Sequence, residues 1–170
     1  MSEIIEKATT LIMKYEGFRA NAYLDSAGVL TIGYGTTHGV VPRMTCTKTQ
    51  AKSWLMEHIS KDLDALTTWC ESENISLNTD QTAAILSFTY NVGFSAFLGS
   101  SIARDLKLGK YKDAAGHFTK WNKIRVGEKL VTLEGLTKRR HEEKRLFLSY
   151  KFVLFFWLHL FLVDFLHLGL

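Results

Sequence analysis

The sequence predicts a mostly helical α+β fold, and three observations lead to this prediction. Apolar residues recur at steps of three and four from Ile4 to Tyr15, which is the period of a helix face. Two short apolar runs then flank turn-forming residues at 25–28, as in a β-hairpin. From residue 47 the helical period returns, and we expect the second half of the chain to be helical. A chain of 170 residues fits one domain, or two lobes that share a helix.

The first helix is expected to end at Glu16. Gly17 follows and suits the C′ position, where a glycine commonly closes a helix. The carbonyl end of a helix carries partial negative charge, which disfavours a carboxylate. We therefore expect the pKa of Glu16 to be raised, as a general acid requires.

Asp25 and Thr31 lie in the predicted hairpin. Asp25 opens the turn, where we expect it to stay solvated and ionised, and the hydroxyl of Thr31 on the returning strand can orient a water molecule. Cleavage of a glycosidic bond takes one protonated carboxyl group and one ionised carboxylate on the opposite face of the sugar. Glu16, Asp25 and Thr31 are thus candidate catalytic residues, although each taken singly also suits an ordinary helix, turn or strand position.

The remaining elements are expected to be helices. Thr47 and Gln50 form a capping box that starts a long helix towards Cys70. The polar stretch 71–79 interrupts the pattern, and the next helix runs from near Asp80 to Gly93. Three shorter helices are predicted at 95–108, 111–121 and 135–149, with breaks at Gly109 and around Gly127.

The spacing of Glu16, eight residues, Asp25, five residues and Thr31 resembles the signature of the phage-type lysozymes, the endolysins of glycoside hydrolase family 24. The resemblance covers roughly residues 3–149. It implies a lysozyme-like catalytic domain over 1–149, in which a small β-hairpin lobe and a larger helical lobe are joined by the long helix. Further matching blocks are Gly33-Tyr34-Gly35, Phe88-Thr89-Tyr90-Asn91-Val92-Gly93, Ala114-Ala115, Trp121-Asn122 and Gly135-Leu136-Thr137-Lys138-Arg139-Arg140-His141-Glu142.

The resemblance also implies an activity. Members of the family are muramidases that cut the β-1,4 bond between N-acetylmuramic acid and N-acetylglucosamine in peptidoglycan. Glu16 would be the general acid, and Asp25 with Thr31 would place the attacking water. The family inverts configuration, which requires carboxyl groups about 6.5–9.5 Å apart. No cofactor and no metal is implied.

The family further suggests Tyr90, Asn91, Ser100 and His117 as substrate-binding residues of the cleft between the lobes. Each also has an ordinary structural role open to it, such as a core tyrosine, a helix cap or a surface histidine. One departure follows the Gly-x-Gly, where many relatives carry a histidine and this chain has Thr36. His38, two positions later, is expected to face solvent.

Composition sets further limits. The net charge of +4 suits an enzyme that works on an anionic envelope, and scattered basic residues without a recognition motif argue against nucleic acid. Cys46 and Cys70 are too few for a disulfide framework and are expected to be reduced and buried. The N-terminus reads as an amphipathic helix and not as a signal peptide. We expect synthesis in the cytoplasm of a host bacterium, action on the periplasmic cell wall, and a monomer, because no heptad seam is present.

Residues 150–170 form a hydrophobic C-terminal extension in which 152–170 is apolar on every side. Three origins are possible for it. The extension is a non-native product of frameshift or read-through, a membrane anchor, or a segment packed on the helical lobe. As a helix, 152–170 would rise about 28 Å, close to the thickness of a hydrocarbon core, and basic residues precede it. Asp164 opposes insertion at a cost of roughly 2.5 to 3.5 kcal/mol, which the many apolar residues can outweigh.

Two alternative functions stay open. The same carboxylate pair would serve a chitin or chitosan hydrolase, because the sequence does not show how a lactyl group is recognised. A non-enzymatic lysis or membrane-binding protein would instead use the basic segment 136–151 and the apolar extension against the bilayer.

Overall fold

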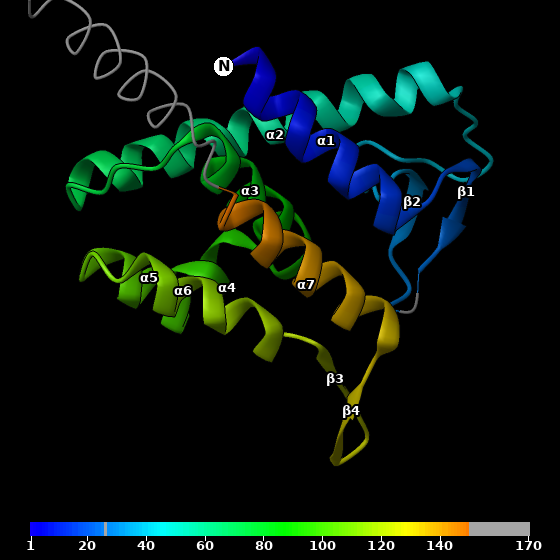
Figure 1. Ribbon diagram of the computed structural model, residues 1–170. Coiled ribbons are helices and arrows are strands. Elements are labelled where there is room, and N and C mark those ends of the chain that lie inside the picture. Colours follow the sequence, from blue (N-terminus) through cyan, green and yellow to red (C-terminus); the bar gives the residue numbers. More distant parts are fainter. Residues whose placement is uncertain (26, 150–170) are drawn as a thin grey trace, which may run out of the picture.

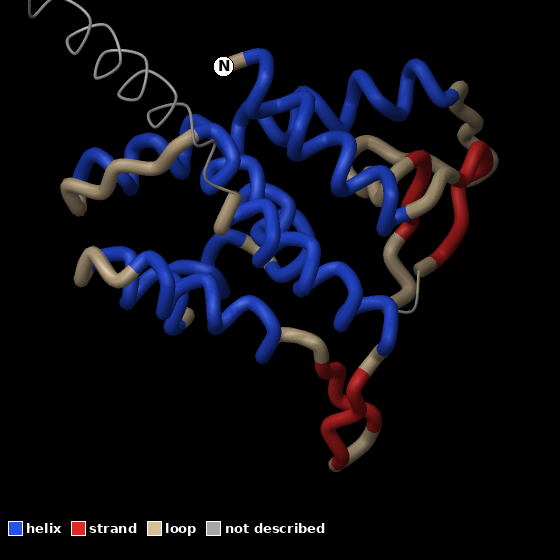
Figure 2. The backbone as a smooth tube through the Cα atoms, in the orientation of Figure 1, coloured by secondary structure: helices blue, strands red, loops and turns tan. Residues whose placement is uncertain are grey.

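The computed structural model describes residues 1–25 and 27–149 (Figure 1). The expectations for the C-terminal extension, including a membrane contact through 152–170, concern residues outside these ranges. Two separate antiparallel hairpins accompany a body of helices, as Figure 2 shows. This arrangement confirms the predicted mostly helical α+β fold. None of the helices within the described ranges has the length and hydrophobicity that crossing a membrane requires.

The order of elements along the chain is helix, hairpin, a run of helices, a second hairpin and a final helix. In sequence they are α1 (Ser2–Glu16), β1 (Arg19–Leu24), β2 (Leu30–Gly33), α2 (Lys48–Ser72), α3 (Thr79–Val92), α4 (Phe94–Leu98), α5 (Ser101–Lys107), α6 (Tyr111–His117), the 3₁₀ turn η1 (Phe118–Lys120), β3 (Lys123–Val126), β4 (Lys129–Thr132) and α7 (Glu134–Phe147).

The first helix and the first hairpin form as predicted. Helix α1 ends at Glu16, and the backbone N–H of Gly17 donates to the Met13 carbonyl at 3.3 Å. Strand β2 pairs antiparallel with β1 and then meets α2 closely. A Cβ added at Gly33 would lie 2.7 Å from the Cβ of Ala51, so only glycine permits this approach. The hairpin is thereby seated directly on the first turn of α2.

Helices α2 and α3 both begin with a capping box. The predicted box of Thr47 and Gln50 is present at α2, and Asn78 with Gln81 forms a second one at α3. Helix α3 is buried throughout 80–89, so it is the central helix of the larger lobe. In Figure 1, α1 and α7 lie along it. Helix α3 therefore supports both α1 and α7 from the interior of the protein.

The shorter helices differ in part from the prediction. The segment predicted as one helix at 95–108 divides into α4 and α5, because Ser100 caps α5 by accepting a hydrogen bond from the Ala103 N–H. The predicted break at Gly109 is confirmed. The helix expected at 111–121 ends at His117 and continues only as the 3₁₀ turn η1.

The prediction of a wholly helical second half is wrong at 123–132, where β3 and β4 form a hairpin. Lys123 pairs with Thr132 and Val126 with Lys129, and the two-residue turn between them begins with Gly127 at a φ of 60°. Glycine in that position is typical of a type II′ hairpin turn. Residues 123–126 do alternate polar and apolar side chains, but four residues are a short signal for a strand, and every residue of both strands is exposed.

The cysteines confirm the expectation that both thiols are unpaired and buried. Burial and the nearby Glu71 raise the pKa of the Cys70 thiol to about 11. Because the thiolate is the reactive form, native Cys70 should react with an aromatic disulfide reagent at about pH 8 roughly a hundredfold more slowly than in the unfolded chain. Raising the pH towards 11 should speed the native reaction. Equal rates before and after denaturation in guanidinium chloride would contradict this prediction.

Candidate active site

Three successive side chains bind the C-terminal end of α1 to α7. The Lys14 Nζ and the Tyr15 hydroxyl each donate to Oε2 of Glu142 at 2.6 Å. The Oε1 atom of Glu16 accepts a hydrogen bond of 2.6 Å from Nη1 of Arg139. Burial and the bond to Glu142 raise the pKa of Tyr15 to about 12, so its hydroxyl remains a donor at neutral pH. The Glu16 carboxyl group is thus held at a fixed place beside α7.

Arg139 is the residue that connects Glu16 to the buried interior. Its side chain is 3% exposed. Besides Glu16, it donates from Nη2 to the Ser87 carbonyl at 2.9 Å and from Nε to Oε1 of Glu143 at 3.1 Å. Three acceptors occupy three different nitrogens, so the planar guanidinium has one orientation. The position of the Glu16 carboxylate therefore depends on α3 and α7 together.

Glu143 lies fully buried between two arginines. Its Oε1 accepts from the Ser87 hydroxyl at 2.8 Å, and its Oε2 lies 3.0 Å from Nη1 of Arg140. Burial raises the pKa of Glu143, while the charges of Arg140 and Arg139 oppose that rise. The same burial lowers the pKa of Arg140 to about 10. Two guanidinium groups and one hydroxyl donor around the carboxyl group suit its ionised form, which balances the buried positive charge.

Gly35 and Tyr90 complete the surroundings of Glu16. Gly35 has a φ of 95°, and a Cβ added there would lie 3.1 Å from the Tyr90 hydroxyl oxygen and 3.8 Å from Oε2 of Glu16. The Tyr90 hydroxyl donates to the Tyr34 carbonyl at 2.8 Å, and burial raises the pKa of Tyr90. The loop that follows β2 thus packs tightly against Tyr90 at Gly35 and lies within van der Waals reach of the candidate acid.

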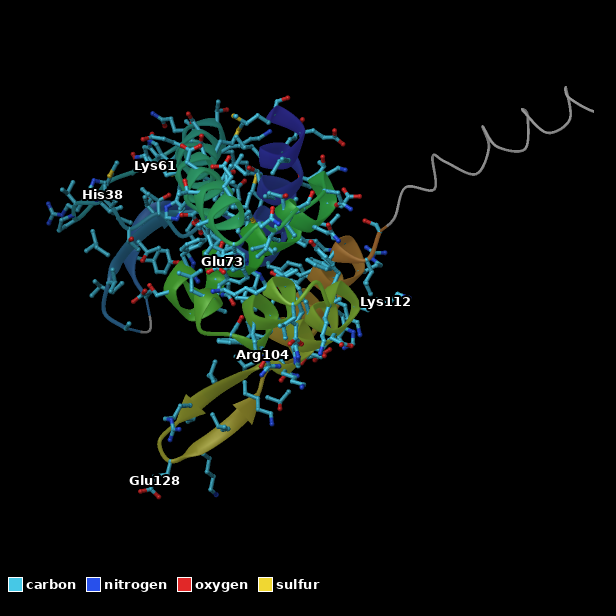
Figure 3. The ribbon with its side chains drawn as sticks, turned by 90° about the vertical axis from the view of Figure 1, so that its left-hand side faces the viewer. His38, Lys61, Glu73, Arg104, Lys112 and Glu128 are labelled. Carbon is cyan, nitrogen blue, oxygen red and sulfur yellow. The ribbon has the colours of Figure 1, made fainter. Side chains whose placement is uncertain are left out.

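The turn that contains Gly35 is closed by backbone hydrogen bonds. Ile32 and Thr36 exchange two hydrogen bonds of 2.9 Å between their backbone N–H and carbonyl groups. His38 is exposed, which confirms the expectation that it faces solvent, and Figure 3 shows it at the edge of the molecule. In this chain, backbone pairing rather than a histidine side chain fixes the loop.

The hairpin β1–β2 positions Asp25 and Thr31. Oδ1 of Asp25 accepts hydrogen bonds from the N–H groups of Ala27 at 2.9 Å and Val29 at 2.8 Å. Among residues 1–25 and 27–149, no donor is bound to Oδ2. Thr31 is buried, and its hydroxyl donates to the Val29 carbonyl at 3.0 Å. A hydroxyl that donates in this way still has lone pairs with which to accept a hydrogen bond from a water molecule.

The other three predicted substrate-binding residues have partners within the protein. Asn91 Oδ1 accepts from Nη2 of Arg140. Ser100 is buried and caps α5, and Nε2 of His117 lies 2.8 Å from Oδ2 of Asp105. Only Tyr90 of the four is brought against the Gly35 loop beside Glu16. Substrate binding by Asn91, Ser100 and His117 stays a prediction.

The sequence analysis did not identify Arg139, Glu143 and Ser87 as parts of the site. Arg139 and Glu143 are separated by four positions on α7, a spacing that pairs opposite charges on one helix face and is visible in the sequence. Nothing local in the sequence links them to Glu16. Within the described part of the chain, no group of three His, Cys, Asp or Glu side chains is placed to hold a metal ion.

The fold indicates the class of protein to which this chain belongs. A small hairpin lobe and a helical lobe built around one buried central helix form the fold of the lysozyme-like proteins. The family model described as "Phage lysozyme" matches residues 13–143, and the chain belongs to this family.

Individual relatives agree with this assignment. The chain is 40% identical to an endolysin of Acyrthosiphon pisum secondary endosymbiont phage 1, over 86% of this chain and 98% of the relative. It is 34% identical to the endolysin of Salmonella phage P22, over 88% and 100% of the two chains. Among solved structures, the muramidase domain of SpmX from Asticaccaulis excentricus is similar with a TM-score of 0.79, at 28% identity over 84% of this chain and 95% of that one. The chain is thus a lysozyme-type muramidase that breaks down peptidoglycan.

The buried charge cluster yields a stability prediction. Glu143→Gln removes the negative charge that balances Arg139 and Arg140 but keeps the shape of the side chain. We expect the free energy of unfolding in urea to fall by about 3 kcal/mol, because breaking a buried ion pair leaves uncompensated charge inside the protein. The matched control is Glu57→Gln, which removes an exposed partner of Lys61 in the interior of α2 and should leave the urea midpoint unchanged. Equal midpoints for both variants would contradict a balancing role for Glu143.

Proposed function

We propose that Glu16 is the general acid of a muramidase that cuts the β-1,4 bond between N-acetylmuramic acid and N-acetylglucosamine. The observation that carries this proposal is the ion pair of Glu16 with Arg139, which holds the carboxyl group beside the Gly35 loop and Tyr90. A proton donor must lie within about 3 Å of the leaving oxygen, so a fixed carboxyl group is a functional requirement. In each turnover the carboxyl group gives its proton to the leaving oxygen and is then protonated again.

The second part of the proposal concerns the water. Asp25, held through Oδ1, presents its other oxygen to a water molecule, and the Thr31 hydroxyl orients that water for attack on the anomeric carbon. Glu16 and Asp25 come from separate elements, α1 and the β1–β2 turn, and the proposal places a water molecule between the sugar and Asp25. This is the requirement of an inverting mechanism.

The catalytic unit of the proposal is residues 1–149, with the β1–β2 lobe and the helical lobe forming the two walls of the cleft. Tyr90, and further along Asn91, Ser100 and His117, would contact the glycan. The enzyme acts on the cell wall as a monomer after synthesis in the host cytoplasm. Two buried unpaired thiols fit synthesis in a reducing compartment.

Release of reducing ends from purified peptidoglycan tests the acid role, because that substrate contains no membrane. Glu16→Gln should lower the rate by at least about two orders of magnitude, since the amide cannot give up a proton but can still accept the bond from Arg139. The matched control is Glu6→Gln, an exposed carboxylate on the same helix, which should leave the rate unchanged. Undiminished sugar release by a folded Glu16→Gln variant would refute the proposal.

A further inference from the structure

The hairpin β3–β4 stands out from the body of the protein. Figure 3 shows it extending away from the helices, with Glu128 at its tip. All of its strand residues are exposed. At its base, the Leu133 N–H donates to the Asn122 carbonyl at 2.9 Å, and the Asn122 amide donates to the Thr137 hydroxyl at 3.0 Å. The hairpin is therefore anchored to α7 at one end and presents both faces to solvent.

The two faces differ in chemistry. Cross-strand partners share a face, so Ile124 with Val131 and Val126 with Lys129 lie on one side of the hairpin. That side exposes 41% of Ile124, 56% of Val126 and 40% of Val131. The opposite side carries Lys123 and Arg125 together with Thr132 and Leu130, of which Leu130 is 62% exposed. An isolated two-stranded hairpin is marginally stable in water, and exposed apolar side chains grouped in this way mark a binding surface.

The place of the hairpin relates it to the active site. In Figures 1 and 3, β3–β4 and the β1–β2 hairpin that carries Asp25 lie on the same side of the molecule. Strand β4 leads directly into α7, whose Arg139 holds Glu16. From Glu134, the first residue of α7, to Arg139 the helix rises about 8 Å. The hairpin therefore lies close to the support of Glu16 and on the side of the molecule that carries Asp25.

The charge of the hairpin indicates the chemistry of the partner that it binds. Lys123, Arg125 and Lys129 outnumber Glu128, so the hairpin is positive. Peptidoglycan carries carboxylates on its peptide stems, whereas chitin carries none. We propose that β3–β4 is a second substrate-binding surface that pairs its basic side chains with stem carboxylates and packs its apolar side against the glycan. This inference rests on the proposed muramidase function and gives a physical basis for preferring peptidoglycan over an uncharged aminosugar polymer.

Steady-state kinetics of the full chain on purified peptidoglycan test the inference. The triple variant K123Q/R125Q/K129Q should raise KM about tenfold with kcat unchanged, because rim charges affect encounter and binding rather than the chemical step. Added salt should weaken wild-type binding and affect the variant less. The double variant K123R/K129R keeps all three positive charges and should therefore have the wild-type KM. Peptidoglycan whose carboxylates have been converted to amides should give the wild-type enzyme the raised KM of the triple variant.

A matched control removes three positive charges elsewhere. K52Q/K110Q/K112Q alters exposed lysines of α2, of α6 and of the residue preceding α6, and Figure 3 shows Lys112 on a different part of the surface from the hairpin. Its KM should stay at the wild-type value. An equal rise in the control would assign the effect to net charge and overturn the inference, as would an unchanged KM in a hairpin variant with the wild-type melting temperature.

Light scattering distinguishes glycan binding by the apolar side of the hairpin from self-association through it. I124S/V131S should raise KM several-fold in a protein that light scattering shows to be monomeric. A stable wild-type dimer that I124S/V131S converts to monomers would assign the apolar side to a second copy and overturn the inference. The two proposals can fail separately. If Glu16→Gln loses all activity while the hairpin variants keep the wild-type KM, the catalytic proposal stands and only substrate binding by the hairpin is refuted.

Discussion

The hydrogen-bonded ion pair between Arg139 and Glu16 is the interaction on which the active site depends. It joins the end of α1 to α7 across 123 positions of sequence, and Arg139 is itself fixed by Ser87 of α3 and by Glu143. Burying two arginines and one glutamate costs solvation free energy, which the ion pairs of Glu143 with both arginines and the hydrogen bonds of Arg139 offset. The protein therefore uses a buried charge cluster to set the position of one partly exposed carboxylate.

The two candidate catalytic carboxylates are supported in different ways. Glu16 is held by the long side chain of Arg139 from the helical lobe, whereas Asp25 is held by backbone N–H groups of its own turn. The hairpin that carries Asp25 is in turn fixed by the close contact of Gly33 with Ala51 and by the bond from Tyr90 to the Tyr34 carbonyl. Tyr90 lies on α3, so the central helix contributes to the placement of both carboxylates. The second hairpin, β3–β4, is anchored to the same α7 that holds Glu16, which places a positive surface next to this support.

The parts of the fold that follow from local chemistry could be predicted from the sequence. The end of α1 at Glu16 followed from apolar spacing and Gly17, and the start of α2 from its capping box. The division at Ser100 was missed although Gly99 and two serines follow Leu98, because the helical spacing of apolar residues resumes at once at Ile102. The β3–β4 hairpin was missed because the alternation of polar and apolar residues before Gly127 is only four residues long and buries no side chain. The role of Arg139 could not be predicted, since its partners meet only through tertiary packing.

The anomeric configuration of the initial product shows how Glu16 and Asp25 act. It tests whether the two carboxyl groups work on opposite sides of one bond with a water molecule between sugar and base. Proton NMR of a peptidoglycan fragment, recorded before the reducing end mutarotates, distinguishes the two anomers. An arrangement in which Asp25 activates water predicts that the β-1,4 bond yields the α-anomer first. Initial formation of the β-anomer would contradict the account, because it requires a carboxylate close enough to form a covalent glycosyl-enzyme.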